Sequence, residues 1–457
     1  MQSRYYLRIK GRPQSFRGNF RLPPSKSYLH RALIVAALSN GSSEITGCGA
    51  ALSEDVLATL RVLKSLGAKI VKSSRSGGTI TVEPGWTHRK KVTVYLKGSG
   101  TTARLAIAFA ALAPKEVEAK FTGDASLSKR PMREILDALS SLGVECYSEK
   151  SNGCLPVVVK GGGIRGGECL VDGSVSSQFI SSLLIACTQA RKDSTIRIKK
   201  PEKLVSRPYI EATLSVLEHF GFEVRVLSTN KLEYVGFQIK GNQSSEGRSF
   251  NLPGDMSSAS ALIGAALSAK GSLNLSEVDL DLPQPDSVFL SFVSKFGGKI
   301  SKSRDSLFVR SSVPSGGLIH LDLKDAPDLV PAVAGLSAGI GCNVRISNIA
   351  HLKFKESDRL HTLATELRKM GVETHETVST LTIRGRSLKE AIRKPILLDP
   401  HSDHRMLMAF TIAALSGRFG EILISDPACV AKSYPDFVRD LQRACGEKNT
   451  ISLAKRK

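Results

Sequence analysis

A repeated pattern runs through the chain six times, with about 75 residues between equivalent points, and such self-similarity constrains the fold more than any single motif. Each copy opens on a short polar segment, continues into an apolar helix and is followed by a second, amphipathic helix. The six polar segments are Ser25-Lys26-Ser27, Gly100-Thr101-Thr102, Ser176-Ser177-Gln178, Asp255-Met256-Ser257-Ser258, Pro327-Asp328 and Asp403-His404-Arg405. The pattern predicts six copies of one mixed α/β unit.

Strand-like segments lie between and after the helices of each copy. Residues 44–49 and 195–200 are examples of the strand that follows the first helix. After the second helix comes a pair of strands with Gly, Ser or Asn at the turn. Each copy therefore has the order β-α-β-α-β-β, and the predicted fold class is α/β.

The chain of 457 residues is longer than one hydrophobic core usually serves, so three copies in each of two lobes are expected. Proline-containing segments at 21–24 and 251–254 precede the first and fourth copies. They are the predicted crossovers, because proline fixes an extended path and ends neighbouring regular structure. We expect residues 23–251 to form the first lobe and residues 1–22 plus 252–457 to form the second.

A formal net charge of +22 is the unusual feature of the composition. Such an excess suits nucleic acid, an acidic membrane surface or small anions. Only 6% of residues are aromatic and no nucleic-acid-binding module is recognisable, so small anions are the favoured partners and nucleic acid is not expected. No apolar stretch reaches the roughly 18 residues of a membrane span and no signal peptide is visible, so we expect a cytoplasmic protein without a membrane partner.

Eight cysteines are scattered through the chain without C-x-x-C spacing or a nearby histidine cluster. This distribution favours buried reduced thiols over a zinc site or a disulfide framework. We therefore expect neither a metal nor an organic cofactor.

The polar segments at the helix starts differ between the two halves of the chain. A helix N-terminus attracts anions, because its N–H groups are unpaired and carry partial positive charge. The first three starts add Ser, Lys, Thr and Gln, whereas the last three carry Asp255, Asp328 and Asp403. The first half is expected to hold an anion and the second half to add acid–base chemistry.

Eight segments, in order, closely resemble the motifs of the 5-enolpyruvylshikimate-3-phosphate synthase family of enolpyruvyl transferases: PPSKSYLHRALIVAAL, GSGTTARL, SLSKRPM, VDGSVSSQFISSLL, LVSRPYIEATL, FKESDRLHTLATELRKMG, SDHRMLMAF and DPACVAKSYPDF. The resemblance implies two inside-out α/β lobes of three repeats each. It also implies transfer of the enolpyruvyl group of phosphoenolpyruvate to the 5-hydroxyl of shikimate 3-phosphate, with release of phosphate, in aromatic amino acid biosynthesis. These two small anionic substrates are the expected partners, and the protein is expected to be a monomer.

The same resemblance assigns residues to both substrates. For shikimate 3-phosphate it implies Lys26, Ser27, Arg31, Ser176, Ser177, Gln178, Ser206, Asp328 and Lys355. For phosphoenolpyruvate it implies Lys26, Gly100, Arg130, Gln178, Arg359, Arg405 and Lys432. Arginine suits such a site because its planar fork pairs bidentately with carboxylate and phosphate. Without the resemblance, each arginine could be part of a surface ion pair and each serine an ordinary helix cap. The first lobe is thus the expected shikimate 3-phosphate side, and the second the phosphoenolpyruvate and acid–base side.

Three residues are implied to be catalytic. Asp328 matches the candidate base for the 5-hydroxyl, Glu356 matches the acid that protonates the methylene carbon of phosphoenolpyruvate, and Lys26 is a further candidate. Addition and elimination need separate acid and base groups, because one group removes a proton while another supplies one, and the roles then reverse. Which group performs each proton transfer stays open. Without the resemblance, Glu356 would be an ordinary acidic residue in the first turn of an exposed helix.

Two positions depart from the family pattern. Lys97-Gly98 stands where Gly-Asn is common before the glycine turn, and His351 stands where some members have an asparagine that touches the shikimate ring. The resemblance also implies that glyphosate competes with phosphoenolpyruvate, with Gly100 leaving room for it.

Two other functions are weighed against this one. The related enolpyruvyl transferase that acts on UDP-N-acetylglucosamine typically has a cysteine in the loop before Arg130, but residues 123–129 contain none. A non-catalytic nucleic-acid-binding repeat protein would explain the charge but not the acidic residues at three helix starts, and its signature would be salt-sensitive binding to DNA or RNA.

Overall fold

The computed structural model of the protein describes residues 5–74, 77–385, 394–446 and 450–455. The chain forms two compact units. The first unit comprises Pro24–Pro253 with Leu282–Gln284, and the second comprises Met1–Pro23, Gly254–Asp281 and Pro285–Lys457. The two lobes expected from the sequence did not place the short stretch Leu282–Gln284 with the first lobe.

The first unit contains three sheets of four strands, ordered β14-β3-β5-β4, β6-β7-β9-β8 and β10-β11-β13-β12. Its strands are β3 (Ser43–Thr46), β4 (Lys69–Ser73), β5 (Thr79–Glu83), β6 (Lys91–Tyr95), β7 (Glu118–Thr122), β8 (Cys146–Ser148), β9 (Val157–Lys160), β10 (Gly167–Val171), β11 (Ser194–Ile198), β12 (Val224–Leu227), β13 (Gly236–Ile239) and β14 (Ser249–Asn251). Its helices are α1 (Lys26–Ala36), α2 (Glu54–Leu66), α3 (Gly100–Ala110), α4 (Arg133–Ser141), α5 (Gln178–Cys187) and α6 (Pro208–His219).

The second unit also contains three sheets of four strands, ordered β16-β17-β15-β2, β18-β19-β21-β20 and β22-β23-β1-β24. Its strands are β1 (Tyr5–Ile9), β2 (Arg17–Arg21), β15 (Ser272–Ser276), β16 (Gly298–Lys302), β17 (Ser306–Ser311), β18 (Leu318–Asp322), β19 (Asn343–Ser347), β20 (Glu373–Glu376), β21 (Leu381–Arg384), β22 (Ile396–Leu398), β23 (Ile422–Ile424) and β24 (Ile451–Lys455). Its helices are α7 (Met256–Ser268), α8 (Phe289–Phe292), α9 (Val330–Ile340), α10 (Arg359–Lys369), α11 (His404–Ala414) and α12 (Phe437–Cys445).

The sheets share one topology, which confirms the predicted sixfold β-α-β-α-β-β repeat. In the second copy β6 runs parallel to β7 from Lys91↔Glu118 to Tyr95↔Thr122, while β9 is antiparallel to both β7 and β8. A parallel first pair needs a helical crossover, and α3 provides it. The hairpin then closes the outer edge of the sheet.

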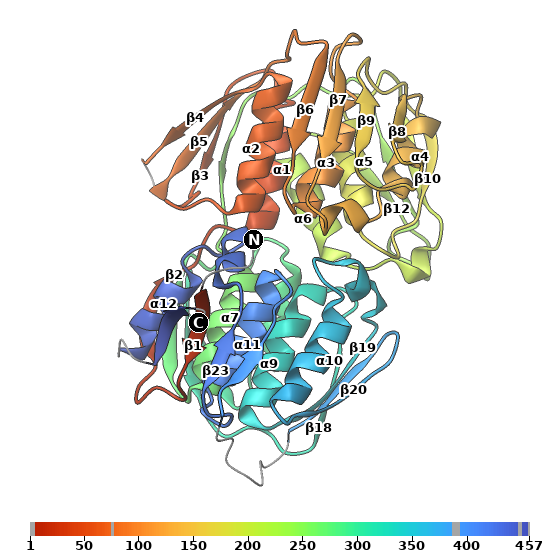
Figure 1. Ribbon diagram of the computed structural model, residues 1–457. Coiled ribbons are helices and arrows are strands. Elements are labelled where there is room, and N and C mark those ends of the chain that lie inside the picture. Colours follow the sequence, from red (N-terminus) through yellow and green to blue (C-terminus); the bar gives the residue numbers. More distant parts are fainter. Residues whose placement is uncertain (1–4, 75–76, 386–393, 447–449, 456–457) are drawn as a thin grey trace. The chain divides into compact units, whose positions relative to one another are not determined.

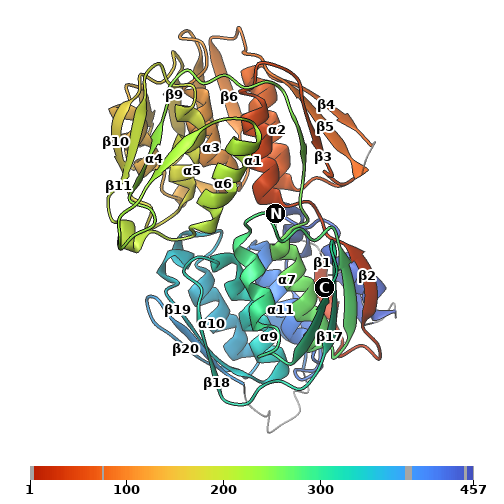
Figure 2. The ribbon, with the colours of Figure 1, turned by 180° about the vertical axis from the view of Figure 1, so that it is seen from behind.

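Helices lie inside each unit and sheets lie outside (Figures 1 and 2). The first helix of each copy is buried on nearly every side, as in α3, where ten of eleven residues from Gly100 to Ala110 are buried. A helix that is apolar all round belongs in a core. The strands alternate instead, so that β6 buries Val92 and Val94 and exposes the residues between them. The architecture is the inside-out α/β arrangement expected from the sequence.

Two strands are exchanged between copies that are distant in sequence. β2 directly precedes α1 but pairs in parallel with β15 of the fourth copy. β14 directly precedes α7 but pairs in parallel with β3 of the first copy. Each exchanged strand takes the place that β6 holds in its own sheet, so the chain passes between the units within 21–24 and 251–254. β1 similarly completes the last sheet by pairing with β23 and β24.

One predicted helix is wrong. Every copy is predicted to have a second, amphipathic helix, but over residues 286–298 of the fourth copy the structure has a 3-10 turn, η4 (Pro285–Val288), followed by the four-residue α8. Gly297 has a φ of 72°, and Gly298 then begins β16. The segment also holds β-branched and aromatic residues, which have lower helix propensity. Within the described ranges, no helix is both long and apolar enough to cross a membrane.

Candidate active site

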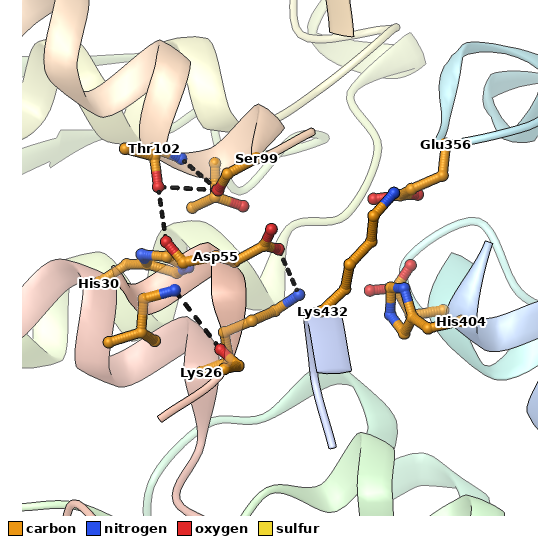
Figure 3. Close-up of polar contacts among 12 residues, drawn as sticks. Lys26, His30, Asp55, Ser99, Thr102, Glu356, His404 and Lys432 are labelled. Carbon is orange, nitrogen blue, oxygen red and sulfur yellow. Dashed lines mark hydrogen bonds and ion pairs between the residues drawn. The ribbon is translucent and has the colours of Figure 1, made fainter. Parts of the chain in front are cut away.

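Lys26 begins α1 and lies against the first turn of α2. Its Nζ is 2.9 Å from Oδ2 of Asp55, and both side chains are largely buried (Figure 3). Ser25 caps the helix with extended backbone but without a side-chain hydrogen bond, so its first N–H groups are not satisfied by that cap. A lysine and a helix N-terminus together favour an anion at this point.

A chain of hydroxyl groups connects α1, α2 and α3 beneath this lysine. His30 Nδ1 is 2.7 Å from Oγ1 of Thr59, which is 2.8 Å from Oγ1 of Thr102. Thr102 donates to the backbone carbonyl of Asp55 at 3.1 Å and lies 2.7 Å from the Ser99 hydroxyl (Figure 3). Burial lowers the pKa of His30 to about 3, so the imidazole is neutral at physiological pH. The network fixes the starts of three helices relative to one another.

Arg31 is buried between α1, α5 and α6. Its Nε donates to Thr213 at 2.7 Å, and its terminal nitrogens donate to the carbonyls of Ser27 at 2.7 Å and Tyr209 at 2.9 Å. Burial lowers the pKa of Arg31 to about 10, yet it stays charged at neutral pH. The guanidinium is therefore held rigidly, and part of its donor capacity already serves the protein.

Gln178 begins α5 and is joined to α3. Its Oε1 accepts a 2.6 Å hydrogen bond from Arg104, and its Nε2 donates to Thr101 at 2.9 Å. Arg104 also lies 3.5 Å from the Ser176 hydroxyl, and its guanidinium lies over the ring of Phe179. The structure thus brings Ser176 and Gln178 together around Arg104, a cation near the start of α3.

Gly100 and Arg130 are neighbours in the first unit. Arg130 follows the 3-10 turn η2 (Leu127–Lys129), and a Cβ atom added to Gly100 would lie only 2.7 Å from its Nη1. The absence of a side chain at residue 100 therefore lets the arginine approach the start of α3. Lys97, one of the departures from the family pattern, has a φ of 51° and pairs with Glu54 at 2.9 Å.

The remaining predicted serines of the first unit lie at helix starts. Ser27 is half-buried in the first turn of α1, and Ser177 is buried at the cap of α5. Ser206 is buried ahead of α6 with a φ of 58°, a left-handed conformation that is uncommon outside glycine. Backbone strain of this kind occurs at binding sites and is consistent with a fixed hydroxyl.

Arg359 is the centre of the second unit's polar cluster. It begins α10, is 1% exposed and contacts three carboxylates. Its nitrogens lie 2.7 Å from Asp328 Oδ1, 2.6 Å from Glu356 Oε2 and 2.8 Å from Asp403 Oδ2. Burial would lower the pKa of Arg359, but the carboxylates, with Asp403 foremost, raise it well above its usual value. The guanidinium is permanently charged and fixed in place.

Asp328 is shared by three cations. Besides Arg359, it pairs with Arg405 at 3.0 Å and with Lys355 at 3.5 Å. Burial alone would raise the pKa of Asp328, but the charges of Arg405, Lys355 and Arg359 hold it well below its usual value. Burial lowers the pKa of Lys355. Asp328 is therefore ionised throughout the physiological range.

The other second-unit residues lie around this cluster. Asp403 caps α11 by accepting a hydrogen bond from the Arg405 N–H at 2.9 Å. Lys432, in the turn η7 (Pro427–Lys432), donates to the carbonyl of Ser402 at 3.1 Å. Figure 3 shows the side chains of Glu356 and Lys432 in this unit. His351 is buried in η6 (Ala350–Phe354), and burial lowers its pKa to about 3, so a neutral structural role fits it.

Sequence reasoning missed Asp55, which contacts the predicted ligand Lys26 from another helix and had no local signal. Arg104 and Asp403 contact the predicted ligands Gln178 and Arg359. Both had a local signal, their place at a helix start. Among the described residues, no group of three or more His, Cys, Asp and Glu side chains is arranged to hold a metal ion.

The arrangement supplies the elements of proton-transfer chemistry on anions. The first unit presents Lys26, Arg31 and Arg130 with hydroxyls and an amide at helix starts, a donor set suited to phosphate. The second unit presents cations that share a few carboxylates. Such fixed charges can stabilise a leaving phosphate while a carboxylate moves a proton.

Comparisons with known proteins agree with this chemistry. The family model described as EPSP synthase (3-phosphoshikimate 1-carboxyvinyltransferase) matches residues 11–441. The 3-phosphoshikimate 1-carboxyvinyltransferases of Methanosphaera stadtmanae and Methanocaldococcus jannaschii are each 36% identical to the chain. The first covers 92% of this chain and 95% of its own, and the second 96% and 98%. An EPSP synthase structure from Acinetobacter baumannii superposes with a TM-score of 0.78 at 25% identity and covers 100% of both chains. The chain belongs to the EPSP synthase family.

Proposed function

We propose that the chain is a 3-phosphoshikimate 1-carboxyvinyltransferase whose reacting centre contains the carboxylate–cation cluster around Arg359. It transfers the enolpyruvyl group of phosphoenolpyruvate to the 5-hydroxyl of shikimate 3-phosphate and releases phosphate. The family match over residues 11–441 is the observation that carries this conclusion. The cluster supports it, because buried paired charges are costly and are commonly kept for function.

The first unit is the proposed source of most shikimate 3-phosphate ligands. Lys26, Ser27 and Arg31 offer donors from consecutive turns of α1, and Ser176, Ser177, Gln178 and Ser206 offer donors from the starts of α5 and α6. Several short, charge-assisted hydrogen bonds are what a phosphate needs. Asp328 and Lys355 of the second unit complete the proposed set.

Phosphoenolpyruvate is proposed to bind Lys26, Gly100, Arg130, Gln178, Arg359, Arg405 and Lys432. Arg359 and Arg405 support this assignment because both are already fixed by Asp328, which removes much of the entropy cost of ordering them on a ligand. The backbone N–H groups at the start of α3 add donors beside Arg130.

Asp328 is proposed to take the proton from the 5-hydroxyl, with Glu356 and Lys26 as the further proton-transfer groups. In the free enzyme Asp328 is ionised, as a base must be, but three cations make it weakly basic. An anionic substrate bound to Arg405 and Arg359 would partly neutralise the positive charge that these arginines place beside Asp328. The pKa of Asp328 would therefore rise. Substrate binding would thereby bring the base closer to the pKa at which general-base catalysis is most efficient.

Substrate choice tests the function. The expected result is release of phosphate only when phosphoenolpyruvate and shikimate 3-phosphate are both present. Turnover with UDP-N-acetylglucosamine at an equal or greater rate would instead assign the chain to the related reaction. We also propose a cytoplasmic monomer, and light scattering at working concentration tests the monomeric state.

A further inference from the structure

A buried carboxyl group outside the proposed ligand set lies in η4 of the second unit. Asp286 is 2% exposed. Its Oδ2 accepts a hydrogen bond from the hydroxyl of Ser257 in the first turn of α7, and its Oδ1 has no hydrogen-bond partner within the described part of the chain. An ionised carboxylate here would leave a charged oxygen unpaired and away from water, which is unfavourable.

The charges around Asp286 act on its pKa in opposite directions. Asp255, the cap of α7, and Asp328, in the turn before α9, both act on it with negative charge. Arg405 of α11 is the opposing cation, but it already donates to the side chain of Asp328 at 3.0 Å and to its carbonyl at 3.4 Å. The adjoining α8, with sequence FLSF, adds no titratable group. Burial, opposed by Arg405 and reinforced by Asp328, raises the pKa of Asp286 to about 7.

We propose that Asp286 acts in its protonated form as a positioning residue, which keeps the pairing between Asp328 and Arg405 intact. The proton removes the charge that would otherwise compete with Asp328 for the Arg405 guanidinium. The hydroxyl of Ser257 holds the neutral carboxyl group at the start of α7. This inference rests on the proposed function, because Arg405 and Asp328 are the groups whose geometry it protects.

Loss of the proton has a defined consequence. Above about pH 7 a second carboxylate would act on Arg405, the cation whose charge opposes the neutral form of Asp286 and which pairs with Asp328. Arg405 would then hold phosphoenolpyruvate less well. The value of kcat/KM for phosphoenolpyruvate should fall as pH rises, with a midpoint near 7.

The test is the pH profile of kcat/KM for phosphoenolpyruvate in wild type and in Asp286→Asn. Asparagine has the shape of the neutral carboxyl group and does not titrate. Wild type should fall through the midpoint near pH 7 to a lower plateau set by the weakened contact with Arg405, whereas Asp286→Asn should show no such midpoint. Asp281→Asn, the same substitution at an exposed residue nearby, should follow wild type.

A second variant reports on Asp286 even where the asparagine variant does not fold. The Ser257 hydrogen bond favours the ionised form, so Ser257→Ala should move the midpoint of the pH profile to higher pH. A merely structural role for Asp286 would lower activity at every pH and leave the midpoint in place.

An infrared titration of the free enzyme separates this inference from the proposed function. The carbonyl stretch of a protonated buried carboxyl group should disappear with a midpoint near pH 7 in wild type and be absent in Asp286→Asn, whether or not the enzyme turns over. A fall in kcat/KM that persists unchanged in Asp286→Asn, or the lack of a carboxyl band that titrates near neutral pH, would overturn the proposal.

Discussion

Nε of Arg359 lies 2.8 Å from Oδ2 of Asp403, and both side chains are almost completely buried. The two residues come from the starts of α10 and α11, so one ion pair fixes two helices of different repeats. A buried charge that loses its partner typically costs about 3–5 kcal/mol. The pair therefore holds the guanidinium in one orientation, from which it also reaches Asp328 and Glu356.

Replacing Gly100 by alanine should weaken inhibition by glyphosate more than binding of phosphoenolpyruvate. The added Cβ would lie 2.7 Å from Nη1 of Arg130, so the arginine must shift and the space beside α3 must narrow. An inhibitor longer than the substrate should lose the most affinity. The ratio of the glyphosate inhibition constant to the KM for phosphoenolpyruvate is the measurement. An unchanged ratio, or inhibition that phosphoenolpyruvate does not relieve, would show that the pocket is arranged differently.

Arg31→Ala should weaken shikimate 3-phosphate binding by about 1.5–3 kcal/mol, the usual contribution of a hydrogen bond to a charged group. It should also destabilise the fold, because the guanidinium joins Thr213 and the Tyr209 carbonyl inside the first unit. Titration calorimetry measures the first effect and chemical denaturation the second. Arg225→Ala, at an exposed position of β12, is the matched control and should change neither. Wild-type affinity in Arg31→Ala would remove this residue from the ligand set.

Acidification should destabilise the protein partly through His30. Its pKa is about 3 in the fold and about 6.5 when exposed, so the neutral imidazole contributes stability that is complete above pH 6.5 and is lost as pH falls toward 3. The loss is at most about 1.4 kcal/mol per pH unit for one group. His30→Asn can keep the Thr59 hydrogen bond without titrating, so its unfolding free energy should fall less steeply below pH 6.5. An identical slope in both proteins would contradict this, and exposed His88→Asn should behave as wild type.

Features set by local sequence were predictable. The polar starts of the buried helices follow from capping chemistry, and Asp255 and Asp403 do accept hydrogen bonds from the first N–H groups of α7 and α11. The strands of the sheets were also predictable, because each copy of the repeat carries its own alternation of apolar and polar residues.

Features set by tertiary contacts were not predictable. Thr59 and Thr102 look like ordinary helix residues until α1, α2 and α3 pack together. The exchange of β2 and β14 depends on pairing between residues more than 200 positions apart, such as Phe250↔Ile45. The unusual environment of Asp286 likewise arises only when η4 packs on α7.

The most direct test of the account is a comparison of chemistry and binding in Asp328→Asn. Asparagine keeps the size of the side chain but removes the base and one negative charge from the cations that surround it. Single-turnover rates, measured beside calorimetric titration with shikimate 3-phosphate, should show chemistry slower by roughly a hundredfold or more while the substrate still binds, since general-base catalysis contributes about 10²–10⁴-fold. Near-normal single-turnover chemistry would contradict the central claim and move the base role to Lys26 or Glu356.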